Sequence, residues 1–175
     1  MKPQTNTNKK KEPITKTHTD IILDSVADGV FTVNNDMVIT YFNKAAEKIC
    51  GIDRKKAVGM YCFDVLRSNI CETECPIRFS LETGKDIIDK RKNILRMDGK
   101  KIPITISSSI LKDENGKMIG GVETFRDLSK IEALEKEHDE APHLRPLQKA
   151  LAEELTIRVH SKAELYAAIE ASQIL

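Results

Sequence analysis

The spacing of apolar residues along the chain predicts short helices and strands separated by clear turn signals. The first predicted helix is apolar on one side and ends at the Asp28-Gly29 pair. Two β-branched runs then flank Asn34-Asn35-Asp36, which predicts a β-hairpin. The apolar side chains of the first helix are Ile21, Ile22, Val26 and Ala27.

Helix start and stop signals follow the hairpin. Asn43 is the predicted N-cap of the helix KAAEKIC, and Gly51 closes that helix. Further short helical pieces are expected from Arg54 to Leu66. Pro76 suits a first helical turn and disfavours helix at the residue before it, so another helix is predicted to begin there and to end at Gly84.

Three longer strands are predicted after this helical region, separated by the turns Met97-Asp98-Gly99 and Asp113-Glu114-Asn115-Gly116. Strands, then short helices, then strands predict an α+β fold: a five-stranded antiparallel sheet flanked by short helices, with a C-terminal helical extension. The three strands are Ile87–Leu95, Lys101–Leu111 and Met118–Phe125.

Composition narrows the classes of function. The 28 basic and 27 acidic residues leave a net charge of +1, which argues against direct nucleic-acid binding by bulk charge. Apolar runs are too short to cross a bilayer, and no apolar stretch follows the early lysines. We therefore expect a cytoplasmic protein without a membrane partner, in which residues 1–18 form a disordered leader because they are almost entirely polar.

Four cysteines are the candidate metal or redox ligands: Cys50, Cys62, Cys71 and Cys75. Thiols in a reducing compartment stay free, bind metal or do redox chemistry. The four histidines lie outside the stretch 19–137, which argues against a haem with a histidine ligand and leaves sulfur and carboxylate as metal ligands.

Two other interpretations of the cysteines stay open. Cys50 and Cys62 are also compatible with ordinary core positions, because free cysteine is among the most buried residue types. Cys71 and Cys75 are spaced for reversible dithiol chemistry, although their neighbours Glu72 and Glu74 would raise the thiol pKa and slow it.

The order of the predicted elements resembles the PAS family. The stretches that carry the resemblance are ILDSVADGVFTVN, ITYFNKAAEKICGI with Asn43 before its helix, VGMYCFDV, DGKKIPITISSSIL and GGVETFRDLSKIEALE. They cover about two thirds of the chain. The resemblance implies a sensory domain over 19–127, an input module for bacterial signal transduction or transcription control that regulates a partner and catalyses nothing itself.

PAS domains end in an Asp-Leu/Ile-Ser/Thr motif, which Asp127, Leu128 and Ser129 match. Ser129 and Glu132 have capping-box spacing, so a signalling helix over 128–140 is predicted to follow the last strand directly. The resemblance implies a homodimer formed through the domain and this helix, and an absent output domain, either a kinase or a transcription activator.

The signalling helix carries a narrow apolar stripe formed by Leu128, Ile131 and Leu134. Such a stripe either seeds a parallel dimer or packs on the chain's own sheet. Both interpretations stay open.

The cysteine segment resembles a Cys-rich variant of PAS found in bacterial enhancer-binding regulators and sensor kinases. Cys62, Cys71 and Cys75 match its C-x8-C-x3-C-P pattern, whereas Cys50 falls outside and would be an improvised fourth ligand. Redox or metal sensing through a cysteine-held iron–sulfur cluster is therefore a hypothesis, with zinc less favoured. The compact C-x2-C pairs typical of ferredoxins and zinc ribbons are missing.

Cys62 also lies roughly where the light-sensing LOV branch of PAS keeps its flavin-reactive cysteine. The chain has YCFDVL where that branch has Asn-Cys-Arg-Phe-Leu-Gln, so the polar groups that would hold the flavin are lost. Flavin is therefore not expected.

The segment 141–175 predicts a helical hairpin. Leu147, Leu151, Leu155 and Val159 recur at four-residue steps, and a capping box at Ser161 opens a second helix through Leu175. Its stretches QKALAEELT, RVH and AAIEAS resemble the end of the α-helical domain of bacterial tyrosyl-tRNA synthetases. Because no HIGH-like or KMSKS-like motif occurs, aminoacylation is not expected. The alternatives to a cofactor-bearing sensor are a cofactor-free dimerisation module and a synthetase-derived, tRNA-related fusion protein.

Overall fold

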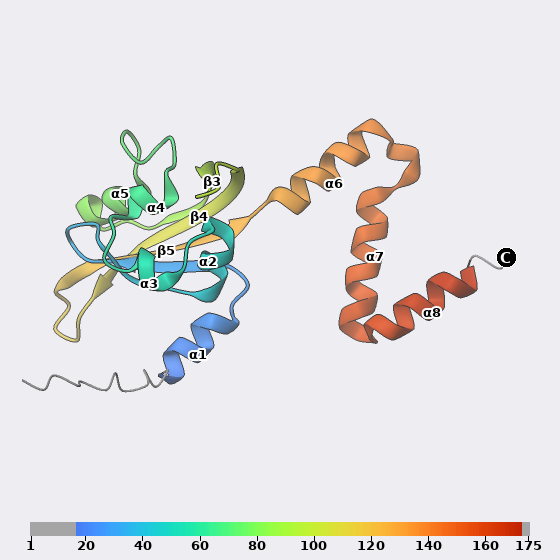
Figure 1. The fold of residues 1–175 in the computed structure, drawn as a ribbon, viewed down its shortest axis with the longest axis horizontal. Coiled ribbons are helices and arrows are strands. Elements are labelled where there is room, and N and C mark those ends of the chain that lie inside the picture. The colour runs from blue at the N-terminus through green and yellow to red at the C-terminus, as the bar shows by residue number, and fades with distance from the viewer. Residues whose placement is uncertain (1–16, 173–175) are drawn as a thin grey trace, which may run out of the picture.

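A sheet of five antiparallel strands forms the centre of the domain, and short helices pack against it (Figure 1). The computed structural model describes residues 17–172, so almost all of the predicted leader and the predicted end at Leu175 lie outside the described residues. The strand order is β2-β1-β5-β4-β3, which confirms the predicted fold class. The strands are β1 (Gly29–Val33), β2 (Ile39–Phe42), β3 (Ile87–Leu95), β4 (Lys101–Lys112) and β5 (Met118–Asp127).

The helices between the first two and the last three strands begin and end at the predicted signals. Pro76 begins its helix, and Gly84 ends it in the left-handed conformation with φ 69°. Gly51, with φ 71°, closes the earlier helix in the same way. These helices are α2 (Lys44–Cys50), α3 (Arg54–Ala57), α4 (Cys62–Leu66) and α5 (Pro76–Thr83).

The first helix, α1 (His18–Ser25), differs from its prediction in extent and in burial. It begins before Asp20 because Thr17 and Asp20 form a capping box: the Thr17 hydroxyl accepts from the Asp20 N–H at 3.2 Å, and the Asp20 carboxylate accepts from the Thr17 N–H at 2.9 Å. Ile21 and Ile22 remain 56% and 51% exposed. The apolar side of α1 is therefore not part of the core.

Asn43 is a fully buried polar hub that joins three elements. As predicted, it caps α2, with its Oδ1 accepting from the Ala46 N–H at 2.9 Å. The same oxygen accepts from the Val30 N–H of β1 at 2.9 Å. Its Nδ2 donates to the Leu23 carbonyl of α1 at 2.9 Å and to the Asp28 carbonyl at 3.0 Å. The side chain thus fixes α1, β1 and α2 relative to one another.

The helix-facing side of the sheet carries the hydrophobic core. Alternate residues of the central strands point into it, as period-two strands require. Phe31 lies between Phe42 and Phe125, with ring centres 6.4 Å and 6.0 Å away. Three of the inward residues of β4 are Ile102, Ile104 and Ile106.

The last strand leads straight into α6 (Ser129–Glu140), as predicted, but the cap differs. Asp127 Oδ1 accepts from the Ser129 N–H at 2.7 Å, and Leu128 occupies the N-cap position without a side-chain cap. The predicted capping box of Ser129 and Glu132 is therefore wrong, because Ser129 is already helical and the Glu132 N–H donates to the Leu128 carbonyl at 2.9 Å.

The apolar stripe of α6 is divided between two environments. Leu128 is buried, and its N–H donates to the Pro103 carbonyl of β4 at 2.8 Å. Leu134 is half-buried, whereas Ile131 is 42% exposed. The beginning of the stripe thus packs on the chain's own sheet, and only its middle is open to another surface.

Beyond α6 the chain continues as η1 (Pro142–Leu144), α7 (Pro146–Val159) and α8 (Lys162–Ser172), which run away from the sheet (Figure 1). Ser161 caps α8, with its hydroxyl accepting from the Glu164 N–H at 3.1 Å. The predicted apolar face of α7 is not buried: Leu151, Leu155 and Val159 are 60%, 52% and 72% exposed. Across residues 17–172, none of the helices is both long and apolar enough to cross a membrane.

Candidate functional site: an internal cavity lined by thiols

Three of the four cysteines line one internal cavity between α4, α5 and the sheet. Cys62 is the first residue of α4, Cys71 lies in the turns before α5, and Cys75 occupies the N-cap position of α5. The C-x8-C-x3-C-P spacing thus places all three thiols around one space. The polar lining residues are Cys62, Ser68, Cys71, Cys75, Lys92 and Glu123.

Glu123 is the feature that sequence reasoning missed. It lies on β5 between Gly121 and Phe125, which share its inward direction, and it is only 4% exposed. Burial raises the pKa of its carboxyl to about 7, against an opposing effect of Lys92. The signal that could have found it is the alternation in GGVETF, which puts a carboxylate at an inward position of a central strand.

Lys92 faces the same cavity from β3, where it pairs with Ile104 of β4. Burial lowers the pKa of its ammonium group, while the nearby Glu123, Cys71 and Cys75 charges oppose that shift. Among the described residues, neither Lys92 nor Glu123 makes a side-chain hydrogen bond or salt bridge. The cavity therefore contains two ionisable side chains of opposite sign without a direct contact.

Two of the three thiols, Cys62 and Cys71, are held in the neutral form. Burial is the main cause that raises the pKa of Cys62 to about 12, and the Cys75, Glu123 and Cys71 charges act in the same direction. Burial also raises the pKa of Cys71, partly offset by a hydrogen bond from Ser68. Metal binding at this site would release protons, because a metal ligand must be a thiolate.

The donor set suits a thiophilic metal in kind, but it is not drawn together around a point. Thiolates and carboxylates are the ligands of zinc and of iron centres. Across residues 17–172, however, no three His, Cys, Asp or Glu side chains are grouped closely enough to hold a metal ion. The cavity volume is about 10 Å³, room for one water molecule.

Cys50 is not part of this cavity. It ends α2 as a fully buried member of the hydrophobic core, and burial raises the pKa of its thiol to about 12. The Glu123 charge acts on it as well. The structure therefore brings together the three thiols of the C-x8-C-x3-C-P pattern and leaves the proposed fourth one among apolar side chains.

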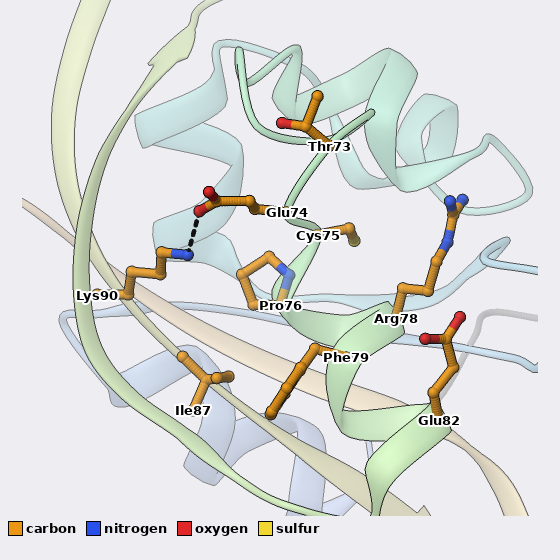
Figure 2. Close-up of a pocket in the computed structure, with 9 residues that line it drawn as sticks. All are labelled: Thr73, Glu74, Cys75, Pro76, Arg78, Phe79, Glu82, Ile87 and Lys90. Carbon is orange, nitrogen blue, oxygen red and sulfur yellow. Dashed lines mark hydrogen bonds and ion pairs between the residues drawn. The ribbon is translucent and has the colours of Figure 1, made fainter.

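A second, outer pocket lies between α5 and β3 and has a volume of about 350 Å³ (Figure 2). Glu74 and Lys90 are joined across it by an ion pair of 2.7 Å. Cys75 and Pro76 line both this pocket and the inner cavity. The start of α5 thus lies between the inner cavity and the outer pocket.

The wall of the inner cavity is also connected to the exit helix. Glu123 belongs to the same strand as Asp127, and this strand leads into α6. Arg126 is tied to Asp28 by two hydrogen bonds of 2.8 and 2.7 Å, which fix the end of β5 against the segment after α1. The strand that carries Glu123 therefore continues directly into α6.

Comparison with known proteins decides the family. The family model described as PAS domain matches residues 27–130. The chain belongs to the PAS domain family. The PAS domain from a Colwellia psychrerythraea protein superposes with a TM-score of 0.56 at 22% identity, covering 64% of this chain and 95% of that one. The PAS domain of nitrogen regulation protein NR(II) from Vibrio parahaemolyticus gives a TM-score of 0.52 at 16% identity, covering 64% of this chain and 99% of that one.

Two kinds of curated relative match this PAS protein over different lengths. The signal transduction histidine-protein kinase AtoS of Escherichia coli is 28% identical over 138 residues, which is 79% of this chain and 22% of the kinase. A tyrosine--tRNA ligase of Flavobacterium johnsoniae is 65% identical over 52 residues, which is 30% of this chain and 12% of the ligase. The chain spans less than a quarter of either relative.

The ligase match confirms the predicted synthetase-like fragment at the C-terminus. The match of 52 residues is longer than the predicted segment 141–175.

Proposed function

We propose that this chain is a sensory input module of bacterial signal transduction or transcription control. Its input site is the cavity lined by Cys62, Cys71 and Cys75, which holds a metal centre, either an iron–sulfur cluster or a single thiophilic ion. The observation that carries the proposal is that these three thiols line one internal cavity. Family membership and the match to a signal transduction histidine kinase support the regulatory role.

The access of solutes to Cys75 supports sensing at this site. Cys75 is half-buried and lines the outer pocket as well as the cavity, so a metal ion or an oxidant reaches it first. Cys62 lies deepest and is 3% exposed. An oxidant that removes the metal would return the thiols to the neutral or the oxidised form, and the turns before α5 would lose their closure.

Output is proposed to pass through β5 into α6, with a second copy of the chain as partner. Leu128 anchors α6 on the sheet, and Ile131 remains exposed for a partner helix. Loss of closure around the site would shift the end of β5 and thereby the register or rotation of paired helices. A kinase or transcription activator would read this change.

Metal content tests the input site. Full-length protein purified without oxygen is expected to contain stoichiometric zinc, or iron with sulfide and a visible absorption band. Replacing any of Cys62, Cys71 or Cys75 with serine should remove most of the metal, whereas Cys50→Ser should retain it, because Cys50 does not line the cavity. Wild-type protein without metal, or three variants with unchanged metal, would contradict the proposal.

A tRNA-related role is a second candidate, favoured by the 65% identity to a tyrosine--tRNA ligase. This role would be limited to binding tRNA, without aminoacylation, because the matched piece is 12% of the ligase and no HIGH-like or KMSKS-like motif occurs. An electrophoretic shift of tRNA by the full chain, lost on deleting residues 142–175, would establish it. Absence of any shift would remove it.

A further inference from the structure

We propose that Cys71 and Cys75 form a reversible disulfide when hydrogen peroxide or another hydroperoxide reaches them. Cys75 is the thiol that reacts first, and Cys71 is the thiol that completes the bond. The inference goes beyond the proposed function, because it concerns the metal-free protein and needs only a pair of thiols. It adds a covalent, redox-dependent modification at the start of α5.

Cys75 is the thiol of the cavity with the best access to solutes. It is half-buried and lines the outer pocket of about 350 Å³ as well as the inner cavity. Cys62 and Cys71 line the inner cavity, which has room for about one water molecule, and not the outer pocket. A hydroperoxide that enters from solvent therefore meets Cys75 before either of the other two thiols.

The spacing of Cys71 and Cys75 suits a disulfide. The segment before α5 is folded into a turn, in which the Glu74 N–H donates to the Ile70 carbonyl at 2.9 Å. Such a hydrogen bond closes one helical turn, in which residues four apart have Cα atoms about 6 Å apart. Cys71 and Cys75 have the same spacing, shifted by one residue along the chain. Disulfides bridge Cα separations of about 4.4–6.8 Å, so the bond needs adjustment only within the turns.

The electrostatics of the cavity also indicate that Cys75 is a close neighbour of the other two thiols. Burial is the main cause that raises the pKa of Cys71, and among the neighbouring charges that of Cys75 acts most strongly. Burial is likewise the main cause for Cys62, and the charge of Cys75 again comes first among the charges. The partner of Cys75 is therefore decided by which of these two residues is free to move.

Cys62 is held more firmly than Cys71. It is 3% exposed and begins α4, and its N–H donates to the Met37 carbonyl at 3.0 Å. Cys71 is half-buried and lies in turns, outside the helices and strands. A bond to Cys62 would require a core helix to shift, whereas a bond to Cys71 rearranges a surface turn. The position of the two residues therefore favours Cys71.

The reaction balances with one peroxide. Deprotonated Cys75 attacks the O–O bond of hydrogen peroxide, so that its sulfur is oxidised to a sulfenic acid and one water is released. The Cys71 thiol then attacks this sulfur, and the hydroxyl group leaves with the thiol proton as a second water. Two thiols lose two electrons in total, and the peroxide gains them. An external dithiol reverses the modification by thiol–disulfide exchange.

The disulfide would join the turns before α5 to the start of that helix, which packs on the sheet. The hydroxyl oxygens of Ser80 in α5 and Ser108 in β4 lie 3.1 Å apart, and Ile77 packs over Gly121 of β5. Oxidation thus alters a segment that contacts two central strands. It also removes two of the three thiols from metal binding, so the oxidised and the metal-bound protein are alternative states of one cavity.

Peptide mass spectrometry of the full chain tests the pairing. Trypsin places both cysteines of the proposed pair in the peptide 68–78, whereas Cys62 falls in the peptide 57–67. Reduced, metal-free protein is treated with hydrogen peroxide, its remaining thiols are alkylated, and the protein is digested. The peptide 68–78 should appear two hydrogen atoms lighter and without alkyl groups, while Cys62 is alkylated. Reduction with dithiothreitol before alkylation should restore both alkylation sites.

Single substitutions test the order of the reaction. Cys71→Ser should leave a sulfenic acid at Cys75 that dimedone traps, whereas Cys75→Ser should abolish the disulfide and slow the loss of thiols. Cys50→Ser is the matched control and should behave as wild type, because Cys50 lies in the apolar core.

Two results of the peptide analysis would contradict the proposal. A cross-link between the peptides 57–67 and 68–78 would overturn the pairing of Cys71 with Cys75. A peptide 68–78 that remains fully alkylated after peroxide treatment would overturn the disulfide itself. Neither result bears on the metal centre, which metal analysis of the untreated protein tests separately.

Discussion

Replacing Asn43 with alanine is expected to lower the free energy of unfolding by about 3–5 kcal/mol. The substitution removes the partner of four backbone groups: the buried N–H groups of Val30 and Ala46 and the half-buried carbonyls of Leu23 and Asp28. Each unsatisfied group costs about 1–3 kcal/mol, reduced where water enters. Urea denaturation followed by far-UV circular dichroism measures the change.

Asn35→Ala is the matched control, because Asn35 lies in the exposed turn between β1 and β2. It should change stability by less than about 0.5 kcal/mol. If Asn43→Ala also lost less than about 1 kcal/mol, the role of Asn43 as the joint between α1, β1 and α2 would be refuted.

The metal-free protein is expected to lose stability as the pH rises, because of Glu123. Its folded pKa of about 7 lies above the value of 4.5 for a free glutamate, so the folded state favours the protonated form. The cost of ionising it is absent below pH 4.5, grows as the pH rises to about 7, and stays constant above that. The shift corresponds to about 3 kcal/mol.

The difference between wild type and Glu123→Gln isolates this effect from the other groups that face the cavity, which are Lys92, Cys62, Cys71 and Cys75. With a chelator present, the variant should gain stability relative to wild type between pH 5 and pH 8 by about 2–3 kcal/mol. Glu135→Gln, on the exposed side of α6, should show no such trend. A pH-independent difference for Glu123→Gln would mean that its carboxyl titrates normally in the folded protein.

The fold could be predicted from the sequence largely because the residues that begin and end its helices act locally. Pro76, Gly84 and Gly51 act through the conformation of their own backbone, and Asn43 acts on the helix it precedes. These signals do not depend on tertiary contacts. The strand boundaries follow for the same reason, because turn residues bracket each of the last three strands.

What could not be predicted depends on competition between neighbours or on contacts far along the chain. Ser129 had the spacing of a cap, but the Glu132 N–H that it would have capped donates to the Leu128 carbonyl, and the Asp127 carboxylate accepts from the N–H of Ser129 itself. The apolar pattern of α1 identified one face of the helix without showing that Ile21 and Ile22 would remain exposed. The periodicity of apolar residues shows which face of a helix is apolar, but it does not show what packs against that face.

The cysteines of the candidate site could be predicted from the sequence, but Glu123 could not. The spacing of Cys62, Cys71 and Cys75 is a local pattern, so the sequence alone is enough to recognise it. Glu123 lies far along the chain and carries no motif, and its place opposite the thiols follows only from the register of β5 between β1 and β4.

The exit helix α6 begins at Ser129, and the PAS family match ends one residue later, at residue 130. The apolar stripe of this helix is divided, with Leu128 buried on the sheet and Ile131 exposed. Whether this helix responds to the cavity therefore decides the proposed function.

Hydrogen–deuterium exchange across α6 tests that response most directly. Full-length protein is compared with zinc bound and after removal of zinc by a chelator. Zinc should slow exchange in the turns of 67–75, at the end of β5 and in the first turns of α6, because an occupied cavity stiffens the strand that forms its wall and leads into the helix. Slower exchange confined to 62–76, with β5 and α6 unchanged, would contradict the account of this domain as an input module.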